Sequence, residues 1–305
     1  MKILVTGGCG FIGSHIVDAY IDMGHKVSII DNLSTGDIKN LNPEAKFFKE
    51  DIRSQNIKKI FEEGKFDVVN HHAAQINVRV SAEDPLFDAD VNIIGSLNLM
   101  SAALRYGVKK FIFASSGGTV YGEPKELPIT EDYPIRPNSP YGISKATFER
   151  YLTLFSLQHN IDYVILRYSN VYGPRQISKS EAGVISIFIE QILKNKECVV
   201  FGDGAQTRDF VYVADVVNAN ISALTCDSVI LNIGTGIETS VNELIDMLSE
   251  ITGQRVAHRH DAPRLEEVRR NVIDPTKAES LIQWRPIVSL KEGIRRTFEY
   301  FQKIS

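Results

Sequence analysis

A tyrosine and a lysine stand four residues apart at the start of a predicted helix, in the stretch PYGISKATFERY, residues 140–151. Residues four apart are neighbours on one face of a helix, so Lys145 would lie beside Tyr141. A free phenol has a pKa of about 10 and is a poor base near neutrality. A nearby cation favours the phenolate, which could then take the proton of an alcohol while a hydride leaves the same carbon. Taken alone, such a pair is more often ordinary helix surface, so its meaning depends on the rest of the chain.

The glycine-rich segment TGGCGFIG, residues 6–13, has the residue types needed to hold a dinucleotide. Gly7, Gly10 and Gly13 lie between a predicted strand and a predicted helix. Glycine permits positive φ and a close approach of the backbone to a diphosphate, and the start of the helix offers unpaired N–H groups. Asp31 ends the next predicted strand, close to the spacing of a carboxylate that binds an adenosine ribose. Because that carboxylate would repel a 2′-phosphate, the pattern predicts NAD rather than NADP.

The elements that must position these groups alternate along the first half of the chain. Strands are predicted at residues 2–8, 25–31, 45–51, 65–73, 109–116 and 162–170, and helices at 11–24, 55–63, 85–106 and 141–159. Strands that alternate with helices are typical of a parallel sheet covered on both faces. We therefore predict an α/β fold with a Rossmann-type doubly wound parallel sheet.

After residue 170 the pattern becomes less regular. Helices are predicted near 184–194, 213–224, 240–252 and 289–303, with short strands at 197–201 and 229–233. We expect a smaller α/β lobe that is interleaved with the first one. Residues 1–170 would form the NAD-binding domain, to which segments near 205–235 return, and residues 171–305 would mainly form the substrate lobe.

Composition and charge restrict the class of protein. Of the 305 residues, 43% are hydrophobic and 24% are charged, which is ordinary for a soluble globular protein. The formal net charge of −4 gives no global attraction to nucleic acid or to an anionic membrane. No apolar run reaches the length of about 18 residues that predicts a spanning helix, and MKILVTGG enters a strand pattern without a signal-peptide core.

Cysteine and histidine positions argue against a metal site. Cys9, Cys198 and Cys226 have no metal-like spacing, so reduced thiols in a cytoplasmic protein are the simplest interpretation. His71 and His72 are adjacent at the end of a predicted strand, where neighbours point to opposite faces. We expect them to pack structurally, and we expect no metal ion.

Together these motifs are similar to those of the extended short-chain dehydrogenase/reductases, and most similar to the UDP-glucose 4-epimerase (UDP-galactose 4-epimerase) family. The resemblance covers nearly the whole chain and rests on TGGCGFIG, DNLSTG (31–36), DI (51–52), HHAAQ (71–75), SSGGTVYG (115–122), YGISK (141–145), LRYSNVYGP (166–174) and RDFVYVAD (208–215). It implies an isomerase that uses NAD to invert C4 of UDP-glucose or UDP-galactose through a transient 4-keto sugar. It also implies a homodimer, formed by helices near 85–106 and 141–159.

The resemblance implies a role for each matching residue. Tyr141 would be the base, and Lys145 would hold the nicotinamide ribose. The other cofactor contacts would be the backbone of Phe11 and Ile12 at the pyrophosphate, Asp31, Asn32, Ser34, Thr35 and Gly36 around the adenosine ribose, Asp51 and Ile52 at the adenine, and Ala73, Ala74, Gln75, Asn92, Ser115 and Tyr168 toward the nicotinamide.

The same resemblance implies how the nucleotide sugar is held. Asn170 and Arg208 would bind the diphosphate with help from Arg264, since a guanidinium matches phosphate geometry through paired donors. The backbone at Val200 and Phe201 would border the uracil.

A residue near the hexose restricts N-acetyl substrates in the resembling family when it is bulky. The register from Arg264 and Glu267 puts Asn271 at this position. Asparagine is of modest size, so UDP-GlcNAc and UDP-GalNAc are expected to enter as well.

One position departs from the pattern of the resembling family. Four residues before Tyr121, where that family has a serine or threonine that bonds the reacting hydroxyl, this chain has Gly117. Ser116, Thr119 or an ordered water would have to replace that hydroxyl.

Two positions disfavour other activities of the same superfamily. Gly118 and Thr119 stand where sugar-nucleotide dehydratases need an acidic pair, which argues against a dehydratase. UDP-glucuronate decarboxylases usually carry a glutamate at the position of Thr119, so this activity is disfavoured as well. UDP-glucuronate 4-epimerase stays open as an alternative. A non-catalytic NAD-binding sensor is disfavoured, because a sensor has no need of Tyr141, Lys145 and Arg208 together.

Overall fold

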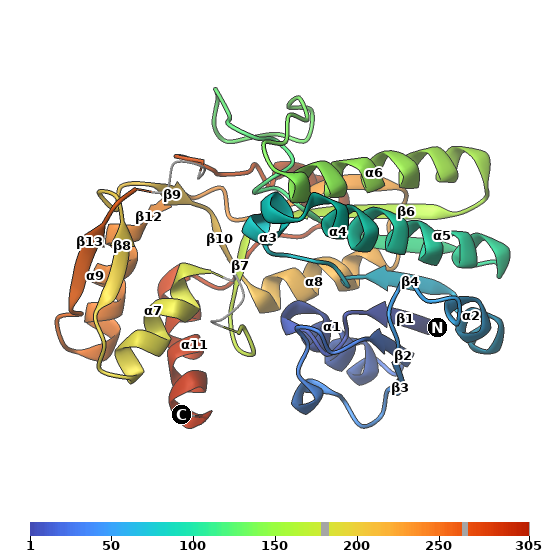
Figure 1. Cartoon of the computed structure of the whole chain (residues 1–305), viewed down its shortest axis with the longest axis horizontal. Coiled ribbons are helices and arrows are strands. Elements are labelled where there is room, and N and C mark those ends of the chain that lie inside the picture. The colour runs from blue at the N-terminus through green and yellow to red at the C-terminus, as the bar shows by residue number, and fades with distance from the viewer. Residues whose placement is uncertain (178–182, 264–267, 305) are drawn as a thin grey trace.

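A seven-stranded parallel sheet forms the centre of the computed structural model, which describes residues 1–177, 183–263 and 268–304 (Figure 1). The strand order is β11-β6-β5-β4-β1-β2-β3, and every neighbouring pair is parallel. The strands are β1 (Lys2–Thr6), β2 (Lys26–Asp31), β3 (Lys46–Lys49), β4 (Val68–His71), β5 (Lys110–Ser116), β6 (Asp162–Tyr168) and β11 (Val229–Ile233). The predicted α/β fold is confirmed. The order reverses between β1 and β4, which is where open α/β sheets bind ligands beyond their strand ends.

Helices cover both faces of this sheet. The helices α1 (Phe11–Asp22) and α8 (Val213–Ala223) pack on one face, and α2 (Ile57–Gly64), α5 (Ser96–Arg105) and α6 (Pro140–Gln158) pack on the other. Strand β1 divides its side chains between the two layers: Ile3 and Val5 join the core of α1, while Leu4 joins the core of α5. This alternation, in strands that are apolar throughout, explains why the sequence shows continuous hydrophobic runs.

The single helix predicted for residues 85–106 is divided in the structure. It begins with α4 (Pro85–Ala89), continues through a π-helical segment η2 (Asp90–Gly95) and ends in α5. A further short helix, α3 (Val78–Glu83), precedes it and was not predicted. Side chains fix both starts, because Asn77 accepts a hydrogen bond from Val80 N and Asp84 accepts one from Phe87 N, both at 2.9 Å.

A smaller lobe with its own hydrophobic core lies beside the sheet. Its core gathers apolar side chains from α7 (Val184–Leu193), α9 (Val241–Thr252), α11 (Leu290–Ile304), β8 (Cys198–Phe201) and β10 (Phe210–Tyr212).

The remaining elements of the whole chain were not predicted and are all short: η1 (Ile38–Asn40), β7 (Asn170–Tyr172), β9 (Thr207–Arg208), β12 (Thr239–Ser240), β13 (His258–Asp261) and α10 (Thr276–Ile282).

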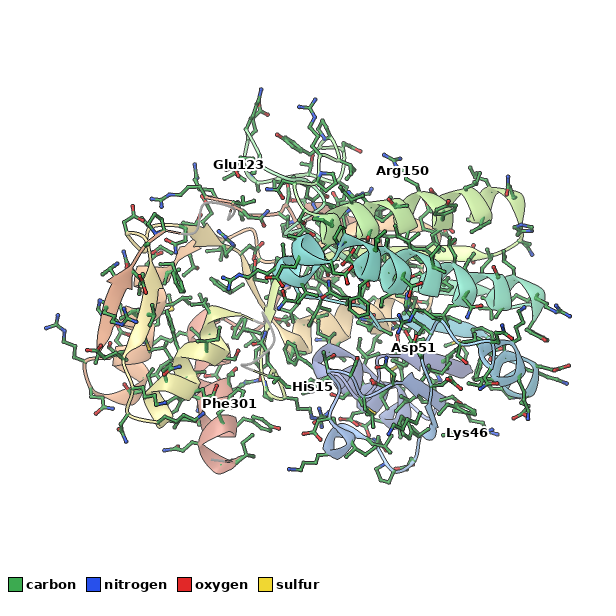
Figure 2. All side chains as sticks on the ribbon, in the orientation of Figure 1. His15, Lys46, Asp51, Glu123, Arg150 and Phe301 are labelled. Carbon is green, nitrogen blue, oxygen red and sulfur yellow. The ribbon has the colours of Figure 1, made fainter. Side chains whose placement is uncertain are left out.

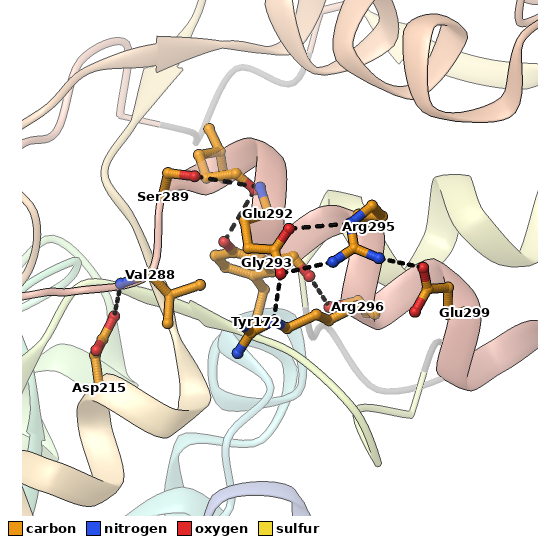
Figure 3. Close-up of polar contacts among 11 residues, drawn as sticks. Tyr172, Asp215, Val288, Ser289, Glu292, Gly293, Arg295, Arg296 and Glu299 are labelled. Carbon is orange, nitrogen blue, oxygen red and sulfur yellow. Dashed lines mark hydrogen bonds and ion pairs between the residues drawn. The ribbon is translucent and has the colours of Figure 1, made fainter.

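The C-terminal helix α11 is fastened to the rest of the molecule near its start (Figure 3). The Asp215 carboxylate accepts the backbone N–H groups of Ile287 and Val288 at 3.1 and 3.2 Å. The Tyr172 hydroxyl donates to the Leu290 carbonyl at 3.2 Å. A Cβ on Gly293 would lie 2.0 Å from the Tyr172 hydroxyl oxygen, so the helix approaches this ring as closely as a glycine allows.

No helix in the described part of the chain has the length and apolar character needed to cross a membrane. Within the same residues, no three or more His, Cys, Asp or Glu side chains are grouped so as to hold a metal ion. The three cysteines are free thiols, of which Cys9 and Cys198 are buried.

Candidate active site

The glycine loop forms a bare backbone turn at the carboxyl end of β1. Gly7 has φ +70° and donates to the Ile30 carbonyl at 2.8 Å, and its own carbonyl accepts Gly10 N at 3.0 Å. A Cβ on Gly13 would lie 2.2 Å from the Gly7 oxygen, and one on Gly7 would lie 2.8 Å from Ala73 N. Side chains are therefore excluded at Gly7 and Gly13.

The start of α1 is suited to an anion. Gly10 is its N-cap and makes no side-chain capping bond, so the first N–H groups, from Phe11, Ile12 and Gly13, have no capping side chain on them. A helix start of this kind offers donors and positive dipole charge to a diphosphate. The cradle of glycines and the uncapped helix fit the pyrophosphate of NAD.

Asp31 lies at the end of β2 beside the glycine loop, and only 7% of its surface is exposed. Its carboxylate accepts Cys9 N at 2.9 Å and Leu33 N at 2.8 Å. A Cβ on Gly36 would lie 2.9 Å from the same carboxylate, so the loop of Ser34, Thr35 and Gly36 folds back over it. Each carboxylate oxygen keeps a lone pair, as binding of a ribose diol requires.

The loop is joined to the next predicted cofactor residues. Asn32 donates to Asp51 at 2.8 Å, and Arg53 forms a salt bridge with Asp51 at 2.8 Å. This guanidinium holds the pKa of the Asp51 carboxyl well below its usual range. Ile52 is 5% exposed and packs in the core, and its carbonyl accepts the Asn98 side-chain amide at 2.8 Å. Figure 2 places Asp51 among the N-terminal strands.

The segment that follows β4 is held between β1 and η2. Ala73 N donates to the Thr6 hydroxyl at 3.1 Å. Asn92 closes a pair of bonds with the Gln75 backbone, accepting its N–H and donating to its carbonyl, both at 2.9 Å. The path Ala73, Ala74 and Gln75 is therefore fixed against the glycine loop.

Tyr168 closes this region at the end of β6. Its ring stacks on that of His72 with centroids 5.9 Å apart. Its hydroxyl lies 3.1 Å from His72 Nε2 and accepts Asn220 Nδ2 at 2.8 Å. His71 is 1% exposed and bridges the hydroxyls of Thr6 and Ser96, in agreement with the structural packing expected of it.

Tyr141 and Lys145 lie in the first turns of α6, whose start is set by Ser139. The Ser139 hydroxyl accepts Gly142 N at 3.2 Å, and Pro140 follows as the first helical residue. The Lys145 ammonium lies 5.7 Å from the Tyr141 ring centroid and donates to the Ala114 carbonyl at 2.9 Å. The spacing therefore brings the pair together on one face, as predicted.

Burial dominates the acidity of this pair. It lowers the pKa of Lys145 to about 8, against the opposing effect of the carboxylates of Asp88 and Glu149. It also raises the pKa of the Tyr141 hydroxyl, and Asp88 raises it further. In the protein alone, burial and Asp88 thus keep the pKa of the Tyr141 hydroxyl above its ordinary value, although Lys145 lies beside the ring. The phenolate therefore needs a further cation beside it, and the oxidised nicotinamide ring of NAD carries such a charge.

The loop after β5 carries the candidate donors. The Ser115 hydroxyl donates to Glu149 at 2.5 Å and is thereby engaged in the core. The Thr119 hydroxyl is buried and has no hydrogen-bond partner among the described residues. The Thr119 carbonyl lies 2.7 Å from where a Cβ of Gly142 would be, so this loop packs against the turn that bears Tyr141. Ser116 is partly exposed at the same loop.

Packing explains why a glycine occupies position 117. A Cβ there would lie 2.9 Å from the Ile273 Cδ1 atom and 3.3 Å from the Arg167 carbonyl oxygen. Ile273 fills the space that a serine or threonine side chain would need. A hydroxyl from elsewhere in the loop is therefore required if the reacting group is to be bonded.

Asn271, a predicted substrate residue, connects this loop to the strand that bears Arg208. It is 1% exposed, its Nδ2 donates to the Gly117 carbonyl at 3.3 Å, and its backbone N–H donates to Thr207 at 3.3 Å. Its Oδ1 is buried without a partner in the described part of the chain. Arg208 follows Thr207 and donates to its carbonyl at 2.8 Å.

Of the other predicted substrate residues, the structure describes Asn170, Val200 and Phe201. Asn170 N donates to the Asp209 carbonyl at 2.9 Å, which places it next to Arg208. Val200 and Phe201 lie on β8, paired with β13, and the Phe201 carbonyl accepts Gln206 at 2.9 Å. Arg264 and Glu267 lie outside the described residues.

The sequence analysis missed two buried groups that bond to the turn of α6 between Tyr141 and Lys145. Asp88 of α4 is fully buried and accepts Ser144 Oγ at 2.5 Å, and Ser81 of α3 accepts Tyr141 N at 3.2 Å. A single aspartate in an amphipathic pattern gives no sequence signal. Ser144 does lie inside the YGISK motif, and its position between the two reactive residues could have drawn attention to it.

Comparison with known proteins adds an independent finding. The model of the "NAD dependent epimerase/dehydratase family" matches residues 3–234. A putative UDP-glucose 4-epimerase of Methanocaldococcus jannaschii is 52% identical over 300 residues, which is 98% of each chain.

Two solved structures are similar along the whole chain. The UDP-glucose 4-epimerase of Thermotoga maritima, solved with UDP-glucose, is 47% identical with a TM-score of 0.98 and covers 100% of this chain and 99% of its own. The UDP-N-acetylglucosamine 4-epimerase of Methanobrevibacter ruminantium, in complex with UDP-N-acetylmuramic acid, is 38% identical with a TM-score of 0.95, covering 100% and 99%.

Proposed function

Because this chain belongs to the NAD-dependent epimerase/dehydratase family, we propose that it is an isomerase that inverts C4 of a UDP-hexose, interconverting UDP-glucose and UDP-galactose. The observation that carries the proposal is the pairing of Tyr141 with Lys145 beside β5, in a molecule whose glycine loop and Asp31 fit NAD. The whole-length similarity to UDP-glucose 4-epimerases supports the same reaction.

Bound NAD supplies reversible acceptance of the C4 hydride, so the sugar passes through a 4-keto form without net oxidation. The protein's own groups handle the proton. Tyr141 takes it from the 4-hydroxyl and returns it after the keto sugar has presented its other face. Lys145, held by the Ala114 carbonyl, contributes positive charge beside the phenol and a donor for a ribose hydroxyl.

We assign the hydrogen bond to the reacting 4-hydroxyl to Thr119 rather than Ser116. The support is that the Thr119 hydroxyl is buried and has no partner in the described residues, which is rare for a hydroxyl without a ligand to bind. Arg208 and Asn170 are assigned to the diphosphate, with Arg264 as the third proposed contact.

The test of this function is product analysis with purified protein. Wild type is expected to convert UDP-galactose to UDP-glucose without added reductant. Tyr141→Phe is expected to lose about 10²–10⁴-fold in kcat, the range for a positioned acid–base group, while binding of NAD and UDP-sugar is retained. Turnover at the wild-type rate in Tyr141→Phe would remove this residue from the mechanism.

We also propose that N-acetylated UDP-hexoses are substrates. Asn271 is small and its amide is turned to the Gly117 carbonyl, and a similar solved structure is that of a UDP-N-acetylglucosamine 4-epimerase. Comparable kcat/KM on UDP-galactose and UDP-GalNAc is expected. Asn271→Tyr is expected to lose turnover of UDP-GalNAc selectively, and an equal loss on both sugars would contradict this assignment.

We propose further that the enzyme works as a homodimer in the cytoplasm. Large apolar side chains are exposed along α4, η2 and α6, namely Leu86 at 82%, Ile94 at 55%, Ile143 at 51%, Leu154 at 45% and Leu157 at 87%. Because α4 and η2 pack against α6, exposed apolar side chains on these helices suit a subunit contact. Sedimentation at micromolar concentration should give twice the chain mass, and Leu157→Asp should shift it toward the monomer. The free thiols accord with a reducing compartment.

We also propose that the two lobes bind different ligands. Residues 1–170, joined by segments near 205–235, would bind NAD, and residues 171–305 would mainly bind the nucleotide sugar. The support is that β11 completes the central sheet, whereas α7, α9 and α11 share a separate core.

A further inference from the structure

A buried carboxylate lies beneath the reactive pair, outside every role assigned so far. Asp88 has no exposed surface and sits on α4, which packs against α6. Its Oδ2 accepts the Ser144 hydroxyl at 2.5 Å. Its Oδ1 accepts the side-chain amides of Gln75 and Asn92, both at 2.9 Å. Burial of a carboxylate is costly unless donors compensate it, and here three donors do so.

These donors connect Asp88 to both halves of the site. Ser144 lies between Tyr141 and Lys145 on α6, while Gln75 and Asn92 line the path proposed for the nicotinamide. From Asn92 the bonds continue, since its carbonyl accepts the Ser96 hydroxyl at 2.7 Å and Ser96 Oγ lies 2.8 Å from His71 Nε2.

The far end of this network reaches the glycine loop and settles the state of the imidazole. Thr6 Oγ1 already accepts His72 N and Ala73 N, so its hydroxyl hydrogen goes to His71 Nδ1 at 2.7 Å. The other nitrogen, Nε2, then carries the proton and donates to Ser96. Burial lowers the pKa of His71 well below its usual value, in agreement with this neutral form.

We propose that Asp88 is a positioning residue that fixes α6 to the cofactor side of the site and, through its charge, sets the pH range in which Tyr141 and Lys145 work. This inference rests on the proposed epimerase function. The carboxylate favours the protonated form of both neighbours. It keeps Lys145 an ammonium at neutral pH and keeps the phenol protonated until a cationic ligand offsets it.

Four other titratable or charged groups lie around the pair. Glu149 of α6 favours the ammonium of Lys145 as Asp88 does, but it is bound by Arg167 of β6 at 2.6 Å. His71 ends β4 and His72 follows it, and burial keeps both neutral, with the pKa of His72 lowered to about 3. Asp88 is thus the carboxylate whose charge faces both reactive residues without a guanidinium on it.

The test is the pH dependence of kcat/KM for UDP-galactose in Asp88→Asn. Asparagine keeps the shape, its oxygen can accept Gln75 and Asn92, and its amide can donate to the rotatable Ser144 hydroxyl. Loss of the charge lowers the pKa of both neighbours, so both limbs of the profile should move to lower pH by about one unit. Above the wild-type optimum, activity should therefore fall by about tenfold.

Ser144→Ala is the matched control, because it removes the link to α6 and keeps the carboxylate. It should lower kcat and leave both limbs in their wild-type positions. An unshifted profile in Asp88→Asn, or an equal shift in Ser144→Ala, would overturn the inference. If Asp88→Asn does not fold by circular dichroism, Asp88→Ser carries the same expectation. Absence of turnover in wild type would instead refute the proposed function.

Discussion

Replacing Thr119 by valine is expected to move stability and activity in opposite directions. Valine has nearly the same shape but lacks the hydroxyl, which is buried and has no partner among the described residues. An unpaired buried polar group costs about 1–3 kcal/mol. Removing it should therefore raise the free energy of unfolding by about 1 kcal/mol, which for a chain of this size raises Tm by about 1–3 °C.

The same change should weaken catalysis. If the hydroxyl bonds the 4-oxygen of the hexose as its charge develops, its loss costs about 10²-fold in kcat, by analogy with other single transition-state donors. That factor corresponds to about 2.7 kcal/mol of activation free energy. A buried hydroxyl with no part in the reaction would show the gain in stability without the loss of turnover.

Two measurements on one preparation decide the matter. Thermal unfolding is followed with NAD present and no nucleotide sugar, and kcat is followed by product analysis with saturating UDP-galactose. Thr119→Ser, which keeps the hydroxyl, should stay close to wild type in kcat. Wild-type turnover in Thr119→Val, or a 10²-fold loss in Ser116→Ala instead, would refute the assignment of the donor to Thr119.

Gly13→Ala should abolish retention of NAD on purification, because its Cβ would lie 2.2 Å from the Gly7 oxygen and would have to open the turn; cofactor content measured by absorbance after denaturation checks this. Gly293→Ala should lower the free energy of unfolding, measured by urea titration, by about 1–3 kcal/mol, because its Cβ would lie 2.0 Å from the Tyr172 hydroxyl oxygen. Adding Tyr172→Phe to this variant should recover part of the lost stability. Because burial lowers the pKa of Lys145 to about 8, its ammonium is present below that pH and lost above it, so kcat/KM should decline above about pH 8; a flat profile up to pH 10 would contradict this.

The long regular elements were predictable because their signals are local. The run KILVTGG predicts β1 from its apolar residues and its glycines, and the observed strand ends at Thr6. Strands β9 and β12 could not be predicted in the same way. They have two residues each and exist only because Thr207 and Arg208 pair with residues 239 and 240. Such pairing is a property of the folded chain and leaves no periodicity in the sequence.

The same difference between local and long-range signals holds for the candidate site. Tyr141, Lys145 and the glycines follow a motif with fixed spacing, so their proximity was predictable. Asp88 is distant from them in sequence, and the packing of α4 on α6 alone brings it beneath the pair. The expectation that a cation lowers the pKa of Tyr141 considered the charge of Lys145 but not burial. Burial has the largest effect on the pKa of this phenol, and it raises that pKa.

Completion of the central sheet by β11 has a consequence for how the molecule is made. The last strand comes from residues 229–233, and its Asn232 accepts the Tyr121 hydroxyl at 2.7 Å and donates to the Ile129 carbonyl at 2.9 Å. A growing chain that has passed residue 170 thus still lacks one edge strand of its seven-stranded sheet. Residues 1–170 therefore do not complete the sheet by themselves, and fragments that end near residue 170 should be degraded in the cell rather than accumulate.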